Sequence, residues 1–414
     1  MQGVRDGHAF RDGQGQGMVE SAGSRQDLSA GALAVRVAMV YAALFFGIGV
    51  SLPFLPVWLK ARGLDAQTIG LALALQSLMR VLVAPAVSHL ADRLGRLRPV
   101  MMVAAAVALA GLVWLGGVAE GTGALLAGVA VAYGAFAPLM PLSDAYAVSA
   151  SRRLGLDYGR MRLWGSLAFI AGSMVAGAVQ DLLPARHLIW LIAGAQAVLM
   201  VAIGLLPRRE RDAGGEQGGD LTEGEGLAIL SVPFFLFVTV AGLVQASHAF
   251  VYGFSALHWK GLGHSGTVVG VLWTTGVVAE IVLFWFSGTV MARLGAVRLL
   301  MIGALAGTVR WIGLSLDPPL GLLFLLQALH GLSFGATHLG AIAFLRSRLP
   351  LSRLATAQSI YGAVSHGLFM TSAMWLSGLL YHQFGARGWW AMAAMTGAAL
   401  LLALPLRRLA PRRA

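Results

Sequence analysis

Residues 99–118 read PVMMVAAAVALAGLVWLGGV, a run of 20 residues without a charged side chain. A helix needs about 20 apolar residues to cross a hydrocarbon core of roughly 30 Å. Arginines precede the run at Arg93, Arg96 and Arg98, where a membrane-spanning helix would leave the lipid. This stretch therefore predicts a transmembrane helix, and the rest of the chain repeats its pattern.

Composition extends the prediction to the whole chain. Of 414 residues, 57% are hydrophobic and only 12% are charged, which is outside the range of soluble domains. We predict an all-α integral membrane protein with twelve transmembrane helices in two six-helix bundles, at about 33–58, 66–90, 99–118, 123–149, 160–180, 187–206, 231–258, 265–290, 297–316, 320–345, 354–382 and 387–405.

The remaining segments are polar. Residues 1–30 are rich in Gly, Gln and Ser, and we expect a disordered cytoplasmic tail. Residues 207–230 carry charges of both signs and many glycines, and are typical of a solvated linker. The predicted bundles therefore cover 31–206 and 231–406, with a short cytoplasmic tail at 407–414.

The basic residues predict the orientation. Of the 30 Lys and Arg residues, 23 fall on the side of the tails and the linker, five fall on the other side, and Arg80 and Arg310 fall inside spans. Cytoplasmic loops carry the excess of Lys and Arg, so both termini and the linker are expected in the cytoplasm of a bacterial inner membrane. The net charge of +12 then needs no nucleic-acid partner.

Several kinds of chemistry are excluded by what the sequence lacks. It has no Cys, so disulfides and thiolate metal sites are excluded. Its two lysines, Lys60 and Lys260, do not lie in a phosphate-binding loop. We find no nucleophile with a base and an orienting group, and no metal-ligand spacing, so we expect neither an enzyme nor a bound cofactor or metal.

The two halves repeat each other at an offset of 200 residues. RLGRLR at 93–98 recurs as RLGAVR at 293–298, and Lys60, Gly63 and Gly70 recur as Lys260, Gly263 and Gly270. Repeated six-helix halves around a central cavity are the architecture of alternating-access carriers.

A motif between the second and third spans suggests a family. SHLADRLGR at 88–96 resembles the signature loop of the major facilitator superfamily, with Ser88 where Gly is usual. We assign a gating role to Asp92, Arg93, Gly95 and Arg96, because a carboxylate and arginines on a tight turn can form and release bonds between helix ends.

Further motifs resemble one branch of that superfamily, the bacterial 3-phenylpropionic acid transporter family. They are LPF (52–54), VWLK (57–60), PLSDA (141–145), DYGR (157–160), RLWGS (162–166), YGFSA (252–256) and GVVAE (276–280). The resemblance implies a symporter that moves an aromatic carboxylate with a proton across the inner membrane.

The arrangement is similar, more distantly, to the lactose permease family. That resemblance implies that Asp144 and Arg162 bind substrate, and that Glu280, Arg310 and His330 serve substrate binding and proton coupling. This chain departs at Ser333, where that family has its proton-carrying glutamate, so the proton site is expected elsewhere.

Inserting a charged side chain at the centre of a span costs about 2.5–3.5 kcal/mol of free energy on membrane-insertion scales. Each such side chain therefore needs a partner or a water-filled cavity. Glu280 is 11 residues from Met291 and Arg310 is 13 from Val297, which places them about 16 and 20 Å deep. We expect them to face each other or one cavity, with Arg310 holding a substrate carboxylate. A purely structural ion pair is the alternative.

Asp144 and Arg162 form a second predicted pair. Asp144 and Glu280 are both candidate proton carriers, and the deeper Glu280 is favoured. Arg80, at the repeat position of Glu280, is expected to line the cavity from the other half. Its alternative role is to tether Asp144 or a backbone carbonyl.

Histidines and aromatic residues complete the predicted site. His330 is a candidate proton relay and His248 a candidate substrate ligand. His338 ranks with His248, and His366 is less favoured. Trp164 and Tyr252 neighbour the polar positions and could stack on an aromatic substrate, although ordinary helix packing explains them equally well.

The predicted function is symport of a small aromatic or related organic acid with a proton, by a monomer in the lipid bilayer. A sugar or nucleoside symporter is one alternative, and a non-transporting membrane sensor is another.

Overall fold

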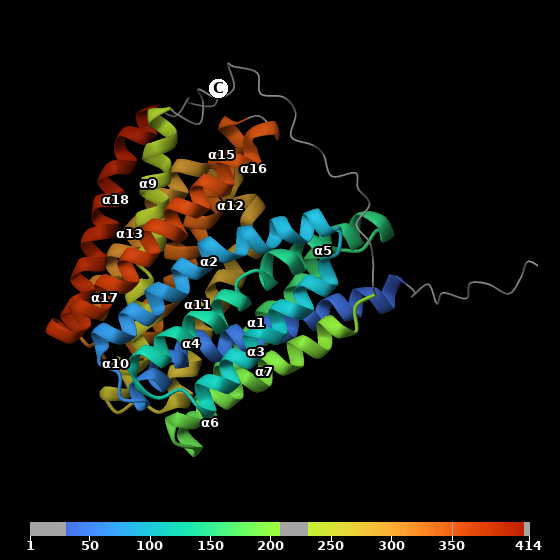
Figure 1. Ribbon diagram of the computed structural model, residues 1–414. Helices are drawn as coiled ribbons and strands as arrows, with labels where there is room; N and C mark the ends of the chain where they lie inside the picture. The colour runs from blue at the N-terminus through green and yellow to red at the C-terminus, as the bar shows by residue number, and fades with distance from the viewer. Residues whose placement is uncertain (1–29, 208–230, 350, 410–414) are drawn as a thin grey trace, which may run out of the picture.

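The computed structural model describes residues 30–207, 231–349 and 351–409, and within these ranges the chain is helical without β-strands (Figure 1). Most of the predicted tails and linker lies outside the described residues. The helices of the first half are α1 (Ala30–Ala61), α2 (Ala66–Leu94), α3 (Leu97–Gly117), α4 (Gly121–Phe136), α5 (Leu139–Leu154), α6 (Tyr158–Leu182), η1 (Ala185–His187) and α7 (Leu188–Gly204).

The second half repeats this order with more interruptions. Its helices are α9 (Val232–Ala246), α10 (Ala249–Gly261), α11 (Gly266–Trp285), α12 (Ser287–Leu294), α13 (Ala296–Leu314), α14 (Leu320–Ala328), η2 (Gly331–Ala336), α15 (Thr337–Arg348), α16 (Leu351–Gly362), η3 (Ala363–Phe369), α17 (Met370–Phe384), η4 (Gly385–Gly388) and α18 (Trp389–Leu409).

The twelve predicted spans are confirmed. Eleven helical stretches of the described chain are long and apolar enough to cross a membrane. The last of them, Thr356–Leu409, has 54 residues and is divided by the 3₁₀ turn η4, so it holds two crossings.

The breaks inside spans have local causes. α4 and α5 are separated at Pro138, which has no backbone N–H to continue the helix. α9 and α10 are separated at Ser247 and His248, whose side chains contact the carbonyl of Val244 that the next helical turn would use. η2 and η3 are π-helical, a form that often marks functional sites. Polar side chains are thus presented at mid-membrane depth in the second half.

Three apolar cores define the shape. One core lies within the first half around Leu33, Met101 and Leu199, and another lies within the second half around Phe237, Leu300 and Ala399. The third core joins both halves through residues such as Phe54 and Phe250. The halves are therefore fused at one end, which we call the closed end, and separate at the other, the open end (Figure 1).

Glycines bring the halves together at the closed end. A Cβ on Gly70 would lie 2.6 Å from the Cα atom of Gly378, and one on Gly177 would lie 2.3 Å from the carbonyl oxygen of Gly266. A Cβ on Gly270 would lie 2.5 Å from the carbonyl oxygen of Ser173. Gly70 and Gly270 are repeat positions, so both halves use the same small residue to let a partner helix approach.

The carboxylate of Asp181 also connects the two halves at the closed end. Asp181 on α6 accepts hydrogen bonds from the backbone N–H groups of Gly266 and Thr267 at 2.5 and 2.8 Å, and its carboxylate lies 3.8 Å from the Nζ atom of Lys260. Each of these partners belongs to the second half. The first turn of α11 is thereby capped by the opposite half, which adds a polar tie to the glycine contacts.

We predict that Gly177→Val separates the closed end. The new side chain would collide with backbone atoms of α11, so the packed conformation should lose population. Because the chain has no Cys, Ser173→Cys provides a single label at this buried contact. A water-soluble maleimide should label this position several-fold faster in the Gly177→Val background. Gly194→Val on α7, where nothing lies within 4 Å of the added Cβ, is the matched control and should leave the rate unchanged.

Candidate functional site

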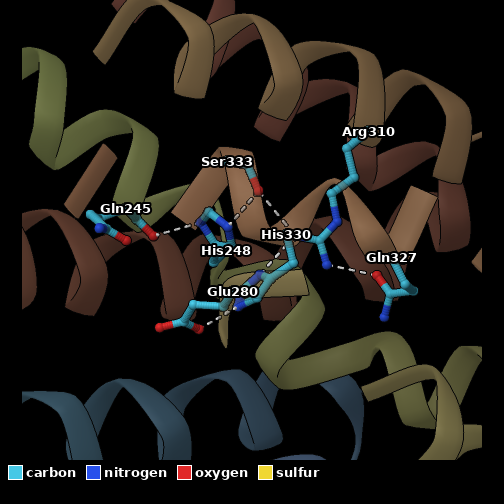
Figure 2. A network of polar contacts seen from close by, with 7 residues as sticks. All are labelled: Gln245, His248, Glu280, Arg310, Gln327, His330 and Ser333. Atoms are coloured by element: carbon cyan, nitrogen blue, oxygen red, sulfur yellow. Dashed lines mark hydrogen bonds and ion pairs between the residues drawn. The ribbon is translucent and has the colours of Figure 1, made fainter. Parts of the chain in front are cut away.

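Arg310 on α13 is the centre of a polar network in the second half (Figure 2). Its side chain is only 2% exposed. The guanidinium donates to Oε1 of Gln327 at 2.6 Å and to Oγ of Ser333 at 3.2 Å, and its Nη1 atom lies 3.0 Å from Nδ1 of His330. Helices α13, α14 and η2 thus converge on one buried cation.

The hydrogen-bond partners fix the tautomer of His330. A guanidinium can only donate, so Nδ1 of His330 must accept, and a neutral imidazole then carries its proton on Nε2. Nε2 lies 3.7 Å from Oε2 of Glu280 on α11. Adding a second proton to His330 would place an N–H against the guanidinium, so it requires Arg310 to move away.

The same reasoning orients His248. Its Nδ1 atom lies 3.0 and 3.2 Å from the carbonyl oxygens of Val244 and Gln245, which can only accept, so Nδ1 carries the proton. Nε2 must then accept from the hydroxyl of Ser333 at 3.2 Å. Ser333 therefore links Arg310 to His248, at the position where the lactose permease resemblance implied a glutamate.

Glu280 is the acidic end of the network. Its side chain is 21% exposed and that of His330 is 13% exposed, although both lie in the middle of spans. Arg162 of α6, in the first half, lies close enough to Glu280 for the two charges to interact. Glu280 and Arg310 therefore face one region, as expected, but His330 lies between them and they form no direct pair in the described chain.

The predicted pair of Asp144 and Arg162 is replaced by other contacts. Asp144 accepts hydrogen bonds from the hydroxyls of Tyr41 at 2.5 Å and Tyr158 at 3.0 Å. The guanidinium carbon of Arg162 lies 4.1 Å from the ring centre of Phe45 and 5.4 Å from that of Tyr41. Asp144 is therefore satisfied by phenols, and Arg162 lies over aromatic faces and is directed toward the opposite half.

Tyr252 and Arg80 lie between the halves. Tyr252 on α10 interacts electrostatically with Glu280 and Arg310 of its own half and with Arg80 of the first half. The side chain of Arg80 on α2 is exposed, and it also interacts electrostatically with Tyr252 of the opposite half. A side chain can have both properties only where the halves leave an accessible space between them.

The predicted gating residues lie at the open end. Gly95 ends α2 with φ at 61°, and its N–H bonds to the carbonyl groups of Ala91 and Asp92. Asp92, Arg93 and Arg96 are exposed in this conformation. A left-handed turn of this kind favours Gly, which explains that position of the motif.

The structure places Trp164 away from the network, unlike the prediction. Its side chain is 57% exposed and lies on the helix face that also exposes Leu167 and Val175. In a bilayer such a face contacts lipid. Trp164 was predicted because it is close to Arg162 in sequence. It is two residues further along the helix, however, and therefore faces almost the opposite way.

Other residues of the network carried weaker sequence signals. Gln327 and Ser333 supply two of the acceptors of Arg310, and both could be noted only as polar residues in an apolar segment. Tyr41 and Tyr158 bind Asp144, but nothing in their spacing indicated that contact, because Tyr41 is 103 residues from Asp144 in sequence.

Comparison with known proteins agrees with this architecture. The model of the MFS_1-like family matches residues 34–392. The chain is 33% identical over 384 residues to the probable 3-phenylpropionic acid transporter of Escherichia coli, covering 91% of this chain and 97% of that protein. It is 27% identical over 332 residues to maltose permease of Geobacillus stearothermophilus, covering 80% and 83%.

Solved structures share the fold at low identity. A crystal structure of a nucleoside transporter superposes with a TM-score of 0.77 at 16% identity, covering 92% of this chain and 100% of that one. A D-xylose–proton symporter gives a TM-score of 0.68 at 14% identity, covering 91% and 98%. With its two six-helix halves, its signature loop and these relatives, the chain belongs to the MFS_1-like family and is a membrane transporter of the major facilitator type.

Proposed function

We propose that this transporter imports a small aromatic or related organic acid together with a proton, by alternating access. The observation that carries the proposal is the chain of contacts from the partly exposed Glu280 through His330 to the buried Arg310, with Arg162 of the opposite half near Glu280. A transporter of an uncharged solute without ion coupling has no need of such charges at mid-membrane depth, where they are costly.

Charge balance couples the two ligands. When Glu280 is ionised, its negative charge compensates the nearby guanidinium groups. Protonation removes that charge, so a second anion, the carboxylate of the substrate, becomes favoured in the same space. Proton and carboxylate therefore bind together, which is the requirement for symport.

The separated end is assigned to the cytoplasm. The excess of Lys and Arg on the side of the tails and linker supports this orientation in a bacterial inner membrane. The described conformation is then inward-facing, with Asp181 and the glycine contacts closing the outer side. In the outward-facing state these contacts separate, and the Asp92 loop joins the halves at the cytoplasmic side. We assign these steps to a monomer, with the proton as coupling ion.

A sugar or nucleoside symporter is the second candidate, favoured by the similarity to a maltose permease over most of the chain. The deciding experiment is uptake of labelled 3-phenylpropionate, maltose and uridine by expressing cells at two external pH values, with and without a protonophore. We expect uptake of 3-phenylpropionate above that of vector cells, stronger at the lower pH and lost with the protonophore. Uptake of maltose or uridine alone would contradict the proposal.

A further inference from the structure

Arg80 is an arginine in the middle of a span, α2. It lies 14 residues from both ends of α2, Ala66 and Leu94. Within the part of the chain that the structure describes, its guanidinium makes no hydrogen bond or ion pair. Its side chain is nevertheless exposed, on the helix face opposite to the apolar residues Leu71, Leu78 and Leu82.

Contacts of neighbouring residues show what Arg80 faces. Ser77, one turn earlier on α2, donates a hydrogen bond to the carbonyl oxygen of His366 on η3 at 3.1 Å. A Cβ on Gly367 would lie 3.2 Å from the side chain of Val81. Arg80 is therefore directed at the second half, and it interacts electrostatically with His366 and Tyr252 there.

The other two arginines of the site already have contacts with protein groups. Arg310 is buried and shared among Gln327, Ser333 and His330. Arg162 lies on two aromatic faces beside Glu280. Arg80 thus combines a full charge, access to the space between the halves and unused donors. An unpaired guanidinium at this depth is costly and is stabilised by an anion.

We propose that Arg80, assisted by His366, binds the carboxylate of the substrate, with the aromatic ring of the substrate against Tyr252. This assignment rests on the proposed function and deepens it. It moves the carboxylate site from Arg310 or Arg162, where the sequence placed it, to the arginine at the repeat position of Glu280. Tyr252 packs on Trp273 with ring centres 5.9 Å apart, so an apolar surface adjoins the cation.

The position of Arg80 also explains how binding of the substrate and binding of the proton are coupled. Tyr252 interacts electrostatically with both Arg80 and Glu280, so both groups lie near one phenol. A carboxylate bound at Arg80 and an ionised Glu280 therefore repel each other. Protonated Glu280 therefore strengthens carboxylate binding at Arg80, and the effect is reciprocal.

The test is ligand binding to the purified full-length transporter in detergent, measured by calorimetry. The probes are 3-phenylpropionate and its uncharged analogue 3-phenylpropanamide, which share the ring and the chain length. Wild-type protein should prefer the acid by about tenfold or more. Arg80→Gln should bind the acid about tenfold more weakly and lose the preference, whereas Arg80→Lys should keep part of it because it keeps the charge.

The outcomes separate the two proposals. Arg387→Gln, at an exposed arginine of the closed end, is the matched control and should bind like wild type. If Arg80→Gln retains the full preference for the acid, the carboxylate lies elsewhere and this assignment is overturned. If wild-type protein binds neither probe, the proposed substrate class is overturned and the assignment falls with it. Thermal unfolding of each variant checks that it is folded.

Discussion

Glu280→Gln is expected to reduce pH-driven accumulation of the substrate by roughly 10- to 100-fold, the range of coupling between two ligands. Glutamine has nearly the same volume and is permanently uncharged, so it imitates protonated Glu280. The anion should still bind, because the guanidinium groups lack their internal counter-charge. Exchange of labelled for unlabelled substrate across the membrane, which needs no net movement of protons, should therefore persist.

The measurement compares accumulation and exchange in the same vesicles. Asp65→Asn provides a matched carboxylate-to-amide control outside the spans. Asp65 caps α2 by accepting from the N–H of Thr68, a bond that lowers the pKa of its carboxyl, and Asn caps helices equally well. Full accumulation by Glu280→Gln would move the proton site to another group, with Asp144 the first candidate.

Arg310→Lys is expected to lose transport by at least tenfold and to lower the unfolding temperature. An ammonium is a point charge with different geometry, so it cannot reach Gln327, Ser333 and His330 together. A buried polar group left without its partner costs about 1–3 kcal/mol. The loss also frees Nδ1 of His330, which would disturb the orientation of its Nε2 atom toward Glu280.

Thermal unfolding in detergent and uptake in vesicles measure the two effects. Arg387→Lys, an exposed arginine changed in the same way, should leave both unchanged. If Arg310→Lys has the stability and the uptake of wild-type protein, the network does not depend on the planar guanidinium group of Arg310.

The fold was predictable because the bilayer constrains it. Uncharged runs such as 99–118 located the spans, and the repeat at 93–98 and 293–298 located the two halves. Even the closed end carried a signal, since Gly70 and Gly270 recur at the same offset and both lie where helices of opposite halves cross. Chain order and helix period are enough to infer such features.

The site was less predictable because it depends on helix rotation and on contacts between distant residues. Two residues separate Arg162 from Trp164, yet one is directed at Glu280 and the other at the exposed face. Charge alone suggested that Asp144 needs a cation, whereas two phenols satisfy it. Likewise, depth suggested Arg310 for the carboxylate, whereas its two Nη atoms already contact Gln327, Ser333 and His330 inside the second half.

In the proposed symport, a proton on Glu280 and a carboxylate between the halves move together. It is tested most directly with purified protein in liposomes that enclose a pH-sensitive dye, under an imposed pH gradient with labelled 3-phenylpropionate. Protein-free liposomes correct for passive entry of the uncharged acid. Wild-type protein should show substrate accumulation with matching proton entry, and Glu280→Gln should show neither. Equal accumulation in both proteins would contradict it.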